Sequence, residues 1–185
     1  MVDALLVMDV QNGIVERLGS AAEPLLARVA VALDAARRHS VPVIYVRVAF
    51  REGAPEISQR NRAFAALASA EAMSESSPAT QVHHAVGPRP GEIVVVKRRV
   101  SAFTGSDLDV VLRAGSIDGV ILTGISTSGV VLSTTRQAAD LDYRITILRD
   151  ACADLDEEVQ RVLMDKVLPR QATVTTSDEW TSSLG

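Results

Sequence analysis

Three apolar segments of this sequence end in groups that can do chemistry. The first ends at Asp9, the second ends at Lys97, and the third runs into a glycine-rich turn at residues 124–129. In an open parallel sheet, ligands bind beyond the carboxyl ends of the strands. A turn that leads into a helix also presents free backbone N–H groups, which favour anions. We therefore expect an acid, a base and a group of amides to meet in one site.

Asp9 and Lys97 suit proton transfer and charge stabilisation. Burial would raise the pKa of the Asp9 carboxyl group and a nearby lysine would lower it, and either environment is compatible with general acid–base catalysis. Lys97 beside Asp9 would hold the carboxylate and offset negative charge on a substrate. The alternatives are a turn carboxylate for Asp9 and an ordinary strand-end lysine for Lys97.

The turn contains hydroxyl groups but no thiol. Ser128 has no histidine nearby in sequence to activate it, so we interpret it as a helix cap. Cys152 is the only cysteine, and we expect it to be a buried packing residue. No cluster of histidines and carboxylates has the spacing of metal ligands, so we expect neither a metal nor a cofactor.

The elements that position these groups alternate between strands and helices. Strand patterns cover residues 4–8, 42–48, 93–97, 119–123, 144–148 and 172–175. Helical patterns cover residues 22–39, 59–72, 106–113, 128–141 and 156–167. Nearly continuous apolar strands separated by helices are typical of a parallel sheet that is covered on both faces.

Composition excludes several classes of function. The net charge of −4 gives no electrostatic footprint for nucleic acid, and a single cysteine cannot form an internal disulfide framework. The first apolar segment has no basic leader and ends at Asp9, which indicates neither a signal peptide nor a membrane span. We therefore expect a cytoplasmic protein with a single domain over residues 1–185 and no nucleic-acid or membrane partner.

Four segments of the sequence resemble the isochorismatase-like hydrolases, a family that includes the nicotinamidases and other cysteine amidases. In order, they read LVMDVQNG at 6–13, PGEIVVVKRRVSAF at 90–103, LTGIST at 122–127 and DACA at 150–153. The resemblance implies a three-layer α/β/α sandwich with a central, mainly parallel, Rossmann-like sheet. It also implies a homodimer or a higher homo-oligomer that acts on a small-molecule substrate.

The resemblance assigns roles to individual residues. Asp9 and Lys97 match two members of the family's Asp–Lys–Cys triad, and Val130 occupies the position of the nucleophile. The backbone N–H groups of Ser126 and Val130 match the oxyanion hole, and a cis peptide bond is expected between Ile125 and Ser126. Isochorismatases proper work without that cysteine. We therefore expect a hydrolase in which Asp9 is the general acid, cleaving a vinyl ether or a related bond.

The alternative is a catalytically inactive relative that binds a small molecule or serves as an oligomeric subunit. Three further residues are expected to contact the substrate: Gln11, Arg47 and Phe103. For Phe103, packing in the core is an equal alternative to an apolar wall of the site. Metal-binding nicotinamidases carry histidines after the second strand, whereas residues 47–51 contain none here.

Overall fold

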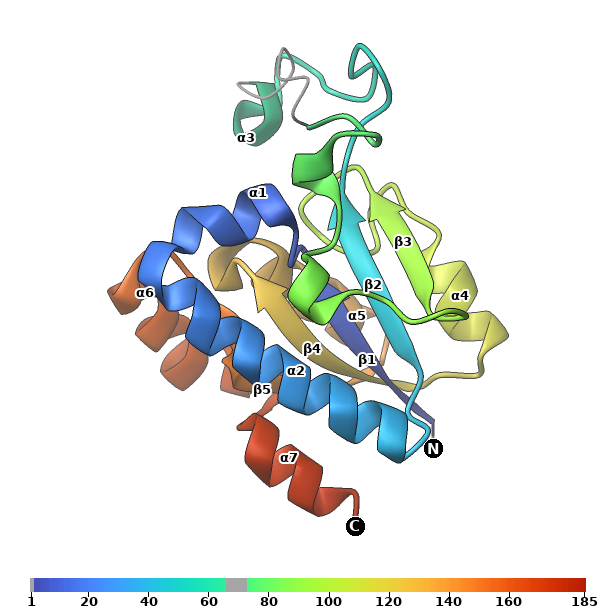
Figure 1. Ribbon diagram of the computed structural model, residues 1–185, viewed down its shortest axis with the longest axis vertical. Helices are drawn as coiled ribbons and strands as arrows, with labels where there is room; N and C mark the ends of the chain where they lie inside the picture. The colour runs from blue at the N-terminus through green and yellow to red at the C-terminus, as the bar shows by residue number, and fades with distance from the viewer. Residues whose placement is uncertain (1, 66–72) are drawn as a thin grey trace.

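The computed structural model describes residues 2–65 and 73–185, which are built around a six-stranded parallel sheet (Figure 1). The neighbouring strands follow the order β3-β2-β1-β4-β5-β6, and every pair is parallel. The strands are β1 Asp3–Met8, β2 Val43–Val48, β3 Ile93–Lys97, β4 Gly119–Ile125, β5 Arg144–Ala153 and β6 Thr173–Thr175. All six predicted strands are present.

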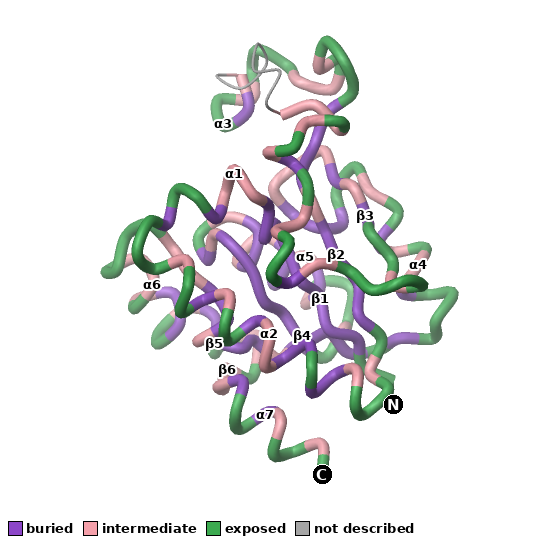
Figure 2. The backbone as a smooth tube through the Cα atoms, viewed as in Figure 1, coloured by how far each residue is buried: buried purple, intermediate pink, exposed green. Residues whose placement is uncertain are grey.

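Helices cover both faces of this sheet. They are α1 Asn12–Val15, α2 Ala22–Arg38, α3 Arg62–Ala65, α4 Leu108–Ala114, α5 Leu132–Asp140, α6 Glu157–Val162 and α7 Ser177–Ser183. Alternate side chains of β1 enter two separate buried clusters, because successive residues of a strand point to opposite faces. Leu6 and Met8 pack in the cluster of α4 and α5, whereas Leu5 and Val7 pack in that of α2 and α7. The central strands β1 and β4 are buried along almost their whole length (Figure 2). The predicted three-layer sandwich is confirmed.

The strand order reverses between β1 and β4. From β1 the chain adds β2 and β3 on one side, and it then returns to add β4, β5 and β6 on the other side. Ligands in doubly wound sheets bind at such a reversal, beyond the carboxyl ends of the strands. Asp9 follows β1 directly and Ser126 follows β4 directly. The two strand ends therefore border the expected binding crevice.

Three predicted elements have boundaries that differ clearly from the structure. The strand predicted at 144–148 continues to Ala153, and the helix predicted at 128–141 begins with a π-helical turn and becomes an α-helix only at Leu132. The helix predicted at 59–72 is helical at 62–65, and residues 66–72 lie outside the described part of the chain. Helix α7 was not predicted. Within the ranges described, no helix is long and apolar enough to cross a membrane.

Candidate active site

Asp9 stands at the carboxyl end of β1, at the reversal point of the sheet. Its backbone N–H donates to the carbonyl of Val46 at 2.8 Å, which fixes the residue to the neighbouring strand. Its φ of 56° lies in the left-handed region, which aspartate adopts more readily than most side chains. Asp9 is only 5% exposed, so its carboxylate lies inside the protein.

Lys97, the last residue of β3, holds one oxygen of this carboxylate. Its Nζ lies 2.9 Å from Oδ2 of Asp9 and also donates to the carbonyls of Arg99 and Val100 at 3.0 and 2.9 Å. Lys97 is 2% exposed, and these contacts occupy all three donors of its ammonium group. The two charged residues that the sequence predicts to meet are therefore in direct contact.

The other carboxylate oxygen of Asp9 has no partner. Its Oδ1 is buried and makes no hydrogen bond within the described ranges. Burial raises the pKa of this carboxyl group above its ordinary value of 3.8. The charge and hydrogen bond of Lys97 and the nearby backbone N–H of Val48 lower this pKa but do not cancel the effect of burial. The site thus contains a buried carboxyl oxygen that has no hydrogen-bond partner among the described residues.

The π-helical turn Thr127–Val131, hereafter the π turn, alters the hydrogen bonds after β4. The carbonyl of Ser126 accepts from the N–H groups of Gly129 and Val131, at 3.1 and 3.2 Å. In an α-helix this carbonyl would accept from the N–H of Val130, four residues on. The π turn therefore releases the N–H of Val130 from its α-helical partner. Such turns are frequent at functional sites.

Ser126 begins this turn and caps it. The peptide bond between Ile125 and Ser126 is cis, which confirms the expectation. The hydroxyl of Ser126 accepts from the N–H of Gly129 at 3.1 Å, whereas the N–H of Ser128 donates to the Asp154 carboxylate at 2.7 Å. The predicted helix cap at Ser128 is therefore wrong, and Ser126 has that role. The backbone N–H of Ser126 itself makes no hydrogen bond to any described residue.

Gly124 allows β4 to pass close to β1 just before the turn. Its φ is +145°, and an added Cβ would overlap the main-chain carbonyl of Met8. We expect Gly124→Ala to lower the free energy of unfolding in urea by about 1–3 kcal/mol or more. Gly53→Ala is the matched control, because Gly53 has a φ of +75° but open space around it. Equal losses in the two variants would contradict this role for the contact with Met8.

The position matched to the nucleophile is occupied by an apolar side chain of the core. Val130 is 2% exposed and belongs to the same buried cluster as Cys152 and Phe103. Cys152 is buried, as predicted, and burial raises the pKa of its thiol to about 12. At neutral pH the only thiol of the chain is therefore not ionised, and thiolate is the reactive form of cysteine.

Gln11 and Arg47 use their polar groups to hold main chain beside the site. The amide of Gln11 donates to the carbonyls of Val48 and Thr80 at 2.9 and 2.8 Å, and it accepts from the N–H of Val48 at 2.8 Å. Arg47 donates to the carbonyl of Glu75 at 3.1 Å and to Thr80. Both side chains therefore join the end of β2 to residues 75–80, and their predicted contact with substrate stays a prediction.

Phe103 lies in the core. It is 7% exposed, and its ring centroid is 5.8 Å from that of Tyr143. This arrangement favours the packing interpretation over a wall that is open to substrate.

An arginine network next to Lys97 could not be seen in the sequence. Arg98 contacts the carbonyl of Ala49 and the carboxylates of Glu56 and Glu75, while Arg99 donates to the carbonyl of Glu56 at 2.9 Å. The sequence favours solvated charge at the strand end for both arginines. Instead, only 14% of the Arg98 side chain is exposed. The pair connects the segment after Lys97 to the loops that follow β2.

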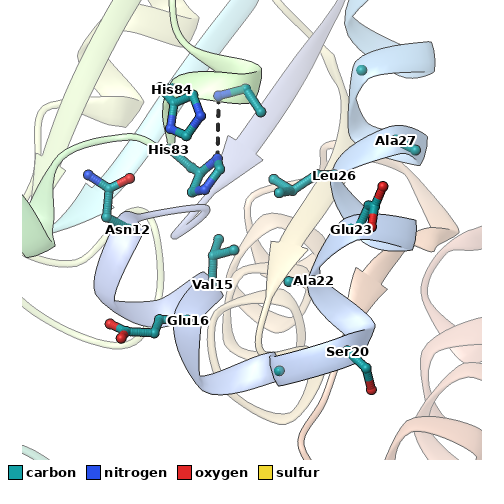
Figure 3. Close-up of a pocket in the computed structure, with 13 residues that line it drawn as sticks. Asn12, Val15, Glu16, Ser20, Ala22, Glu23, Leu26, Ala27, His83 and His84 are labelled. Atoms are coloured by element: carbon teal, nitrogen blue, oxygen red, sulfur yellow. Dashed lines mark hydrogen bonds between the residues drawn. The ribbon is translucent and has the colours of Figure 1, made fainter.

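A separate open groove of about 730 Å³ runs between α1, α2 and residues 83–85 (Figure 3). His83 and His84 stack at its edge with ring centroids 4.4 Å apart, and Nδ1 of His83 accepts from the N–H of Ala85. Glu16 and Glu23 also line the groove. In residues 2–65 and 73–185 no group of three or more His, Cys, Asp and Glu side chains could hold a metal ion. A function without metal remains a prediction.

Comparisons with known proteins identify relatives of this chain. Residues 3–179 match the model of the isochorismatase domain. The isochorismatase family protein YwoC of Bacillus subtilis (strain 168) is 30% identical over 179 residues, which cover 96% of this chain and 91% of YwoC. The ureidoacrylate amidohydrolase RutB of Stutzerimonas stutzeri (strain A1501) is 31% identical over 169 residues, which cover 80% of this chain and 68% of RutB.

A solved structure is also similar to this chain. The cysteine hydrolase from Pseudomonas syringae pv. phaseolicola 1448A superimposes with a TM-score of 0.91 and 25% sequence identity. The match covers 98% of this chain and 92% of that one.

Proposed function

Because this chain belongs to the isochorismatase family of hydrolases, we propose that it hydrolyses a small metabolite with Asp9 as the general acid and without a covalent thiol intermediate. One observation carries this proposal. The Oδ1 atom of Asp9 is buried and has no protein partner in the described ranges, while its other oxygen is held by Lys97. A carboxyl group that is fixed on one side and open on the other is suited to deliver a proton to a bound molecule.

The raised pKa of Asp9 supports this role. Burial favours the protonated carboxyl group, so the acid form persists closer to neutral pH than in an exposed aspartate. In the proposed reaction the protonated Asp9 donates its proton to the vinyl-ether carbon, and water adds to the resulting oxocarbenium ion while its released proton returns to the Asp9 carboxylate. The hemiketal formed in this way then collapses with cleavage of its C–O bond, which gives a carbonyl product and an alcohol. Lys97 keeps the carboxylate in place and stabilises the charge left on it after proton transfer. A vinyl ether or a related bond fits this chemistry.

The turn after β4 is proposed to bind the negative end of the substrate. The backbone N–H groups of Ser126 and Val130 would donate to a carboxylate or to an oxyanion, as the π turn leaves the N–H of Val130 without its α-helical acceptor. Beside this site we propose Arg47 and Gln11 as residues that position the adjoining main chain, whereas Phe103 packs in the core.

A second candidate is a non-catalytic relative that binds a metabolite. It is favoured by Val130, which puts an inert side chain at the position matched to the thiol. The two candidates differ in turnover. We expect hydrolysis of at least one member of a panel of isochorismate, ureidoacrylate, other ureido acids, simple amides and vinyl ethers. Binding of a panel member by calorimetry, without any turnover, would favour the second candidate.

Iodoacetamide distinguishes the proposed mechanism from that of a thiol hydrolase. We expect full activity after treatment, because Cys152 is buried and its thiol pKa is about 12. Loss of activity, with an adduct on Cys152 and protection by substrate, would contradict the absence of a thiol intermediate.

Val130→Cys should place a thiol with a lowered pKa in the π turn, where burial slows its alkylation because Val130 is 2% exposed. The residue lies in the π turn that leads into α5, where the helix dipole favours an anion, and cysteines at helix N-termini and near cations have pKa values of about 3.5–7.5. We would measure the rate of alkylation by a small reagent against pH in a Cys152→Ser background. Leu141→Cys is the matched control, because Leu141 is the C-cap of the same helix and 38% exposed. A Val130→Cys thiol that titrates no lower than the control would contradict the proposed position of the site.

A further inference from the structure

Thr127, the first residue of the π turn, has a buried hydroxyl group that no described protein atom satisfies. The residue is 0% exposed, and its Oγ1 makes no hydrogen bond within residues 2–65 and 73–185. We propose that Thr127 contacts the ligand directly, with its hydroxyl donating to a carboxylate group that the π turn holds. The inference rests on the proposed position of the site, but it does not depend on turnover.

The other buried threonines show how this fold normally treats such a group. Each of them within the described ranges uses its hydroxyl in a hydrogen bond to main chain: Thr80, Thr123, Thr134 and Thr135. A buried polar group without a partner destabilises the folded protein, and a valine of the same shape would fill the space without that cost. The unpaired hydroxyl of Thr127 therefore needs an explanation other than packing.

Thr127 lies at the same edge of the sheet as the unpaired oxygen of Asp9. Asp9 follows β1 directly, Thr127 is the second residue after β4, and these strands are paired with Met8 opposite Gly124 (Figure 1). Five buried side-chain oxygens of the described residues lack a partner, but three belong to partly exposed side chains that bond through another atom. The other two are Oδ1 of Asp9 and Oγ1 of Thr127. Their position at adjacent strand ends indicates that both serve one bound molecule.

The neighbouring N–H groups indicate which kind of group the hydroxyl binds. Thr127 stands in the turn between Ser126 and Val130, whose N–H groups are proposed to donate to an anion. A carboxylate has two oxygens with about four acceptor sites, so it can accept from both N–H groups and from the hydroxyl at once. A ligand without an oxygen at this point would leave the hydroxyl buried and unpaired, and the site would discriminate against it.

Thr127→Val tests the first part of this inference without any ligand. Because the variant loses an unpaired hydroxyl and keeps its shape, we expect a urea midpoint equal to that of the wild type or higher. Thr134→Val is the matched control. The hydroxyl of Thr134 accepts from the buried N–H of Ala102 at 3.0 Å, so its loss should lower the midpoint. A midpoint that falls as far in Thr127→Val as in Thr134→Val would overturn the proposal.

Calorimetry with isochorismate, ureidoacrylate and malonate tests the second part. For a probe that binds the wild type, we expect Thr127→Val to raise Kd by about tenfold or more and Thr134→Val to leave it unchanged. A purely structural threonine would not combine unchanged or increased stability with weaker binding. In the wild type, the NMR signal of the Thr127 methyl group should shift when the probe is added.

Two results of these binding measurements would overturn the proposal. One is wild-type affinity in a folded Thr127→Val variant, and the other is a Thr127 methyl signal that none of the three carboxylates shifts at millimolar concentration. Carboxylate binding that depends on Thr127, without hydrolysis of any panel member, would instead count against the proposed catalytic function alone.

Discussion

Asp9→Asn is expected to lower kcat by a factor of about 10²–10⁴, the usual contribution of a general acid. Asparagine has nearly the same shape as aspartate but cannot donate the proton that the mechanism requires. Its side-chain oxygen can still accept from Lys97, which also keeps the carbonyls of Arg99 and Val100 as partners. The fold should therefore persist. The measurement is the steady-state rate on whichever panel substrate the wild type hydrolyses.

Two controls make this result specific to Asp9. Asp34→Asn removes a carboxylate on the surface, where 66% of the side chain is exposed, and should leave kcat unchanged. Circular dichroism and thermal unfolding establish that Asp9→Asn is folded. Wild-type kcat in a folded Asp9→Asn variant would remove Asp9 from the mechanism.

Lys97→Met should cost about 3–5 kcal/mol of stability, because it leaves a buried carboxylate without its counter-charge. The carbonyls of Arg99 and Val100 also lose their donor. Lys166→Met is the matched control, since Lys166 is the only other lysine of the chain and is exposed. Urea denaturation of the two variants should give a large loss of unfolding free energy for Lys97→Met and almost none for Lys166→Met. Equal values would contradict the importance of the buried pair.

The stability loss in Lys97→Met should depend on pH in a defined direction. Lys97 lowers the pKa of Asp9 in the wild type, so its removal leaves burial unopposed and raises that pKa further. A carboxyl group whose folded pKa exceeds its unfolded value stabilises the protein at low pH, and this contribution is lost as the pH rises through the folded pKa. The difference from wild type should therefore be smaller near pH 4, where the lost donor of the Arg99 and Val100 carbonyls still contributes, and should widen toward neutral pH. A difference that narrows as the pH rises would contradict this account.

Much of the fold could be predicted because its information is local. Each predicted strand is a short apolar run followed by a turn or a charged residue, and such runs need no tertiary context to be recognised. The second half of β5 shows the limit of this approach. Arg149 and Asp150 interrupt the apolar pattern, yet the strand continues to Ala153. Asp150 is accommodated because it accepts from the N–H and the hydroxyl of Ser177 at 2.8 and 2.7 Å.

Helix α7 has a local signal at its N-terminus in the sequence. Thr176 caps the helix through the N–H of Glu179, and the Glu179 side chain in turn accepts from the N–H of Thr176. A threonine followed three residues later by a glutamate is the signature of a capping box.

The residues of the candidate site also fall into those that local sequence predicts and those that it does not. Asp9 and Lys97 could be predicted because each follows an apolar strand. The environment of Gln11 and Arg98 could not, because their partners at residues 75 and 80 are 23 or more positions away in the chain. The π turn was also missed, since residues 128–141 have ordinary helical periodicity. It depends instead on which N–H groups reach the carbonyl of Ser126.

The anion site of the proposed function is formed by main-chain N–H groups. Its ability to bind an anion can therefore be kept during evolution while the side chain that does chemistry changes. The N–H group of residue 130 is positioned by the hydrogen bonds of the π turn, whereas the side chain at that position takes no part in them. Mutation at residue 130 could thus exchange one reaction type for another while an ancestral ability to hold anionic ligands was inherited unchanged. A family member that lost its nucleophilic side chain would still have an anion-binding site. Selection could then produce a different catalytic activity at that site.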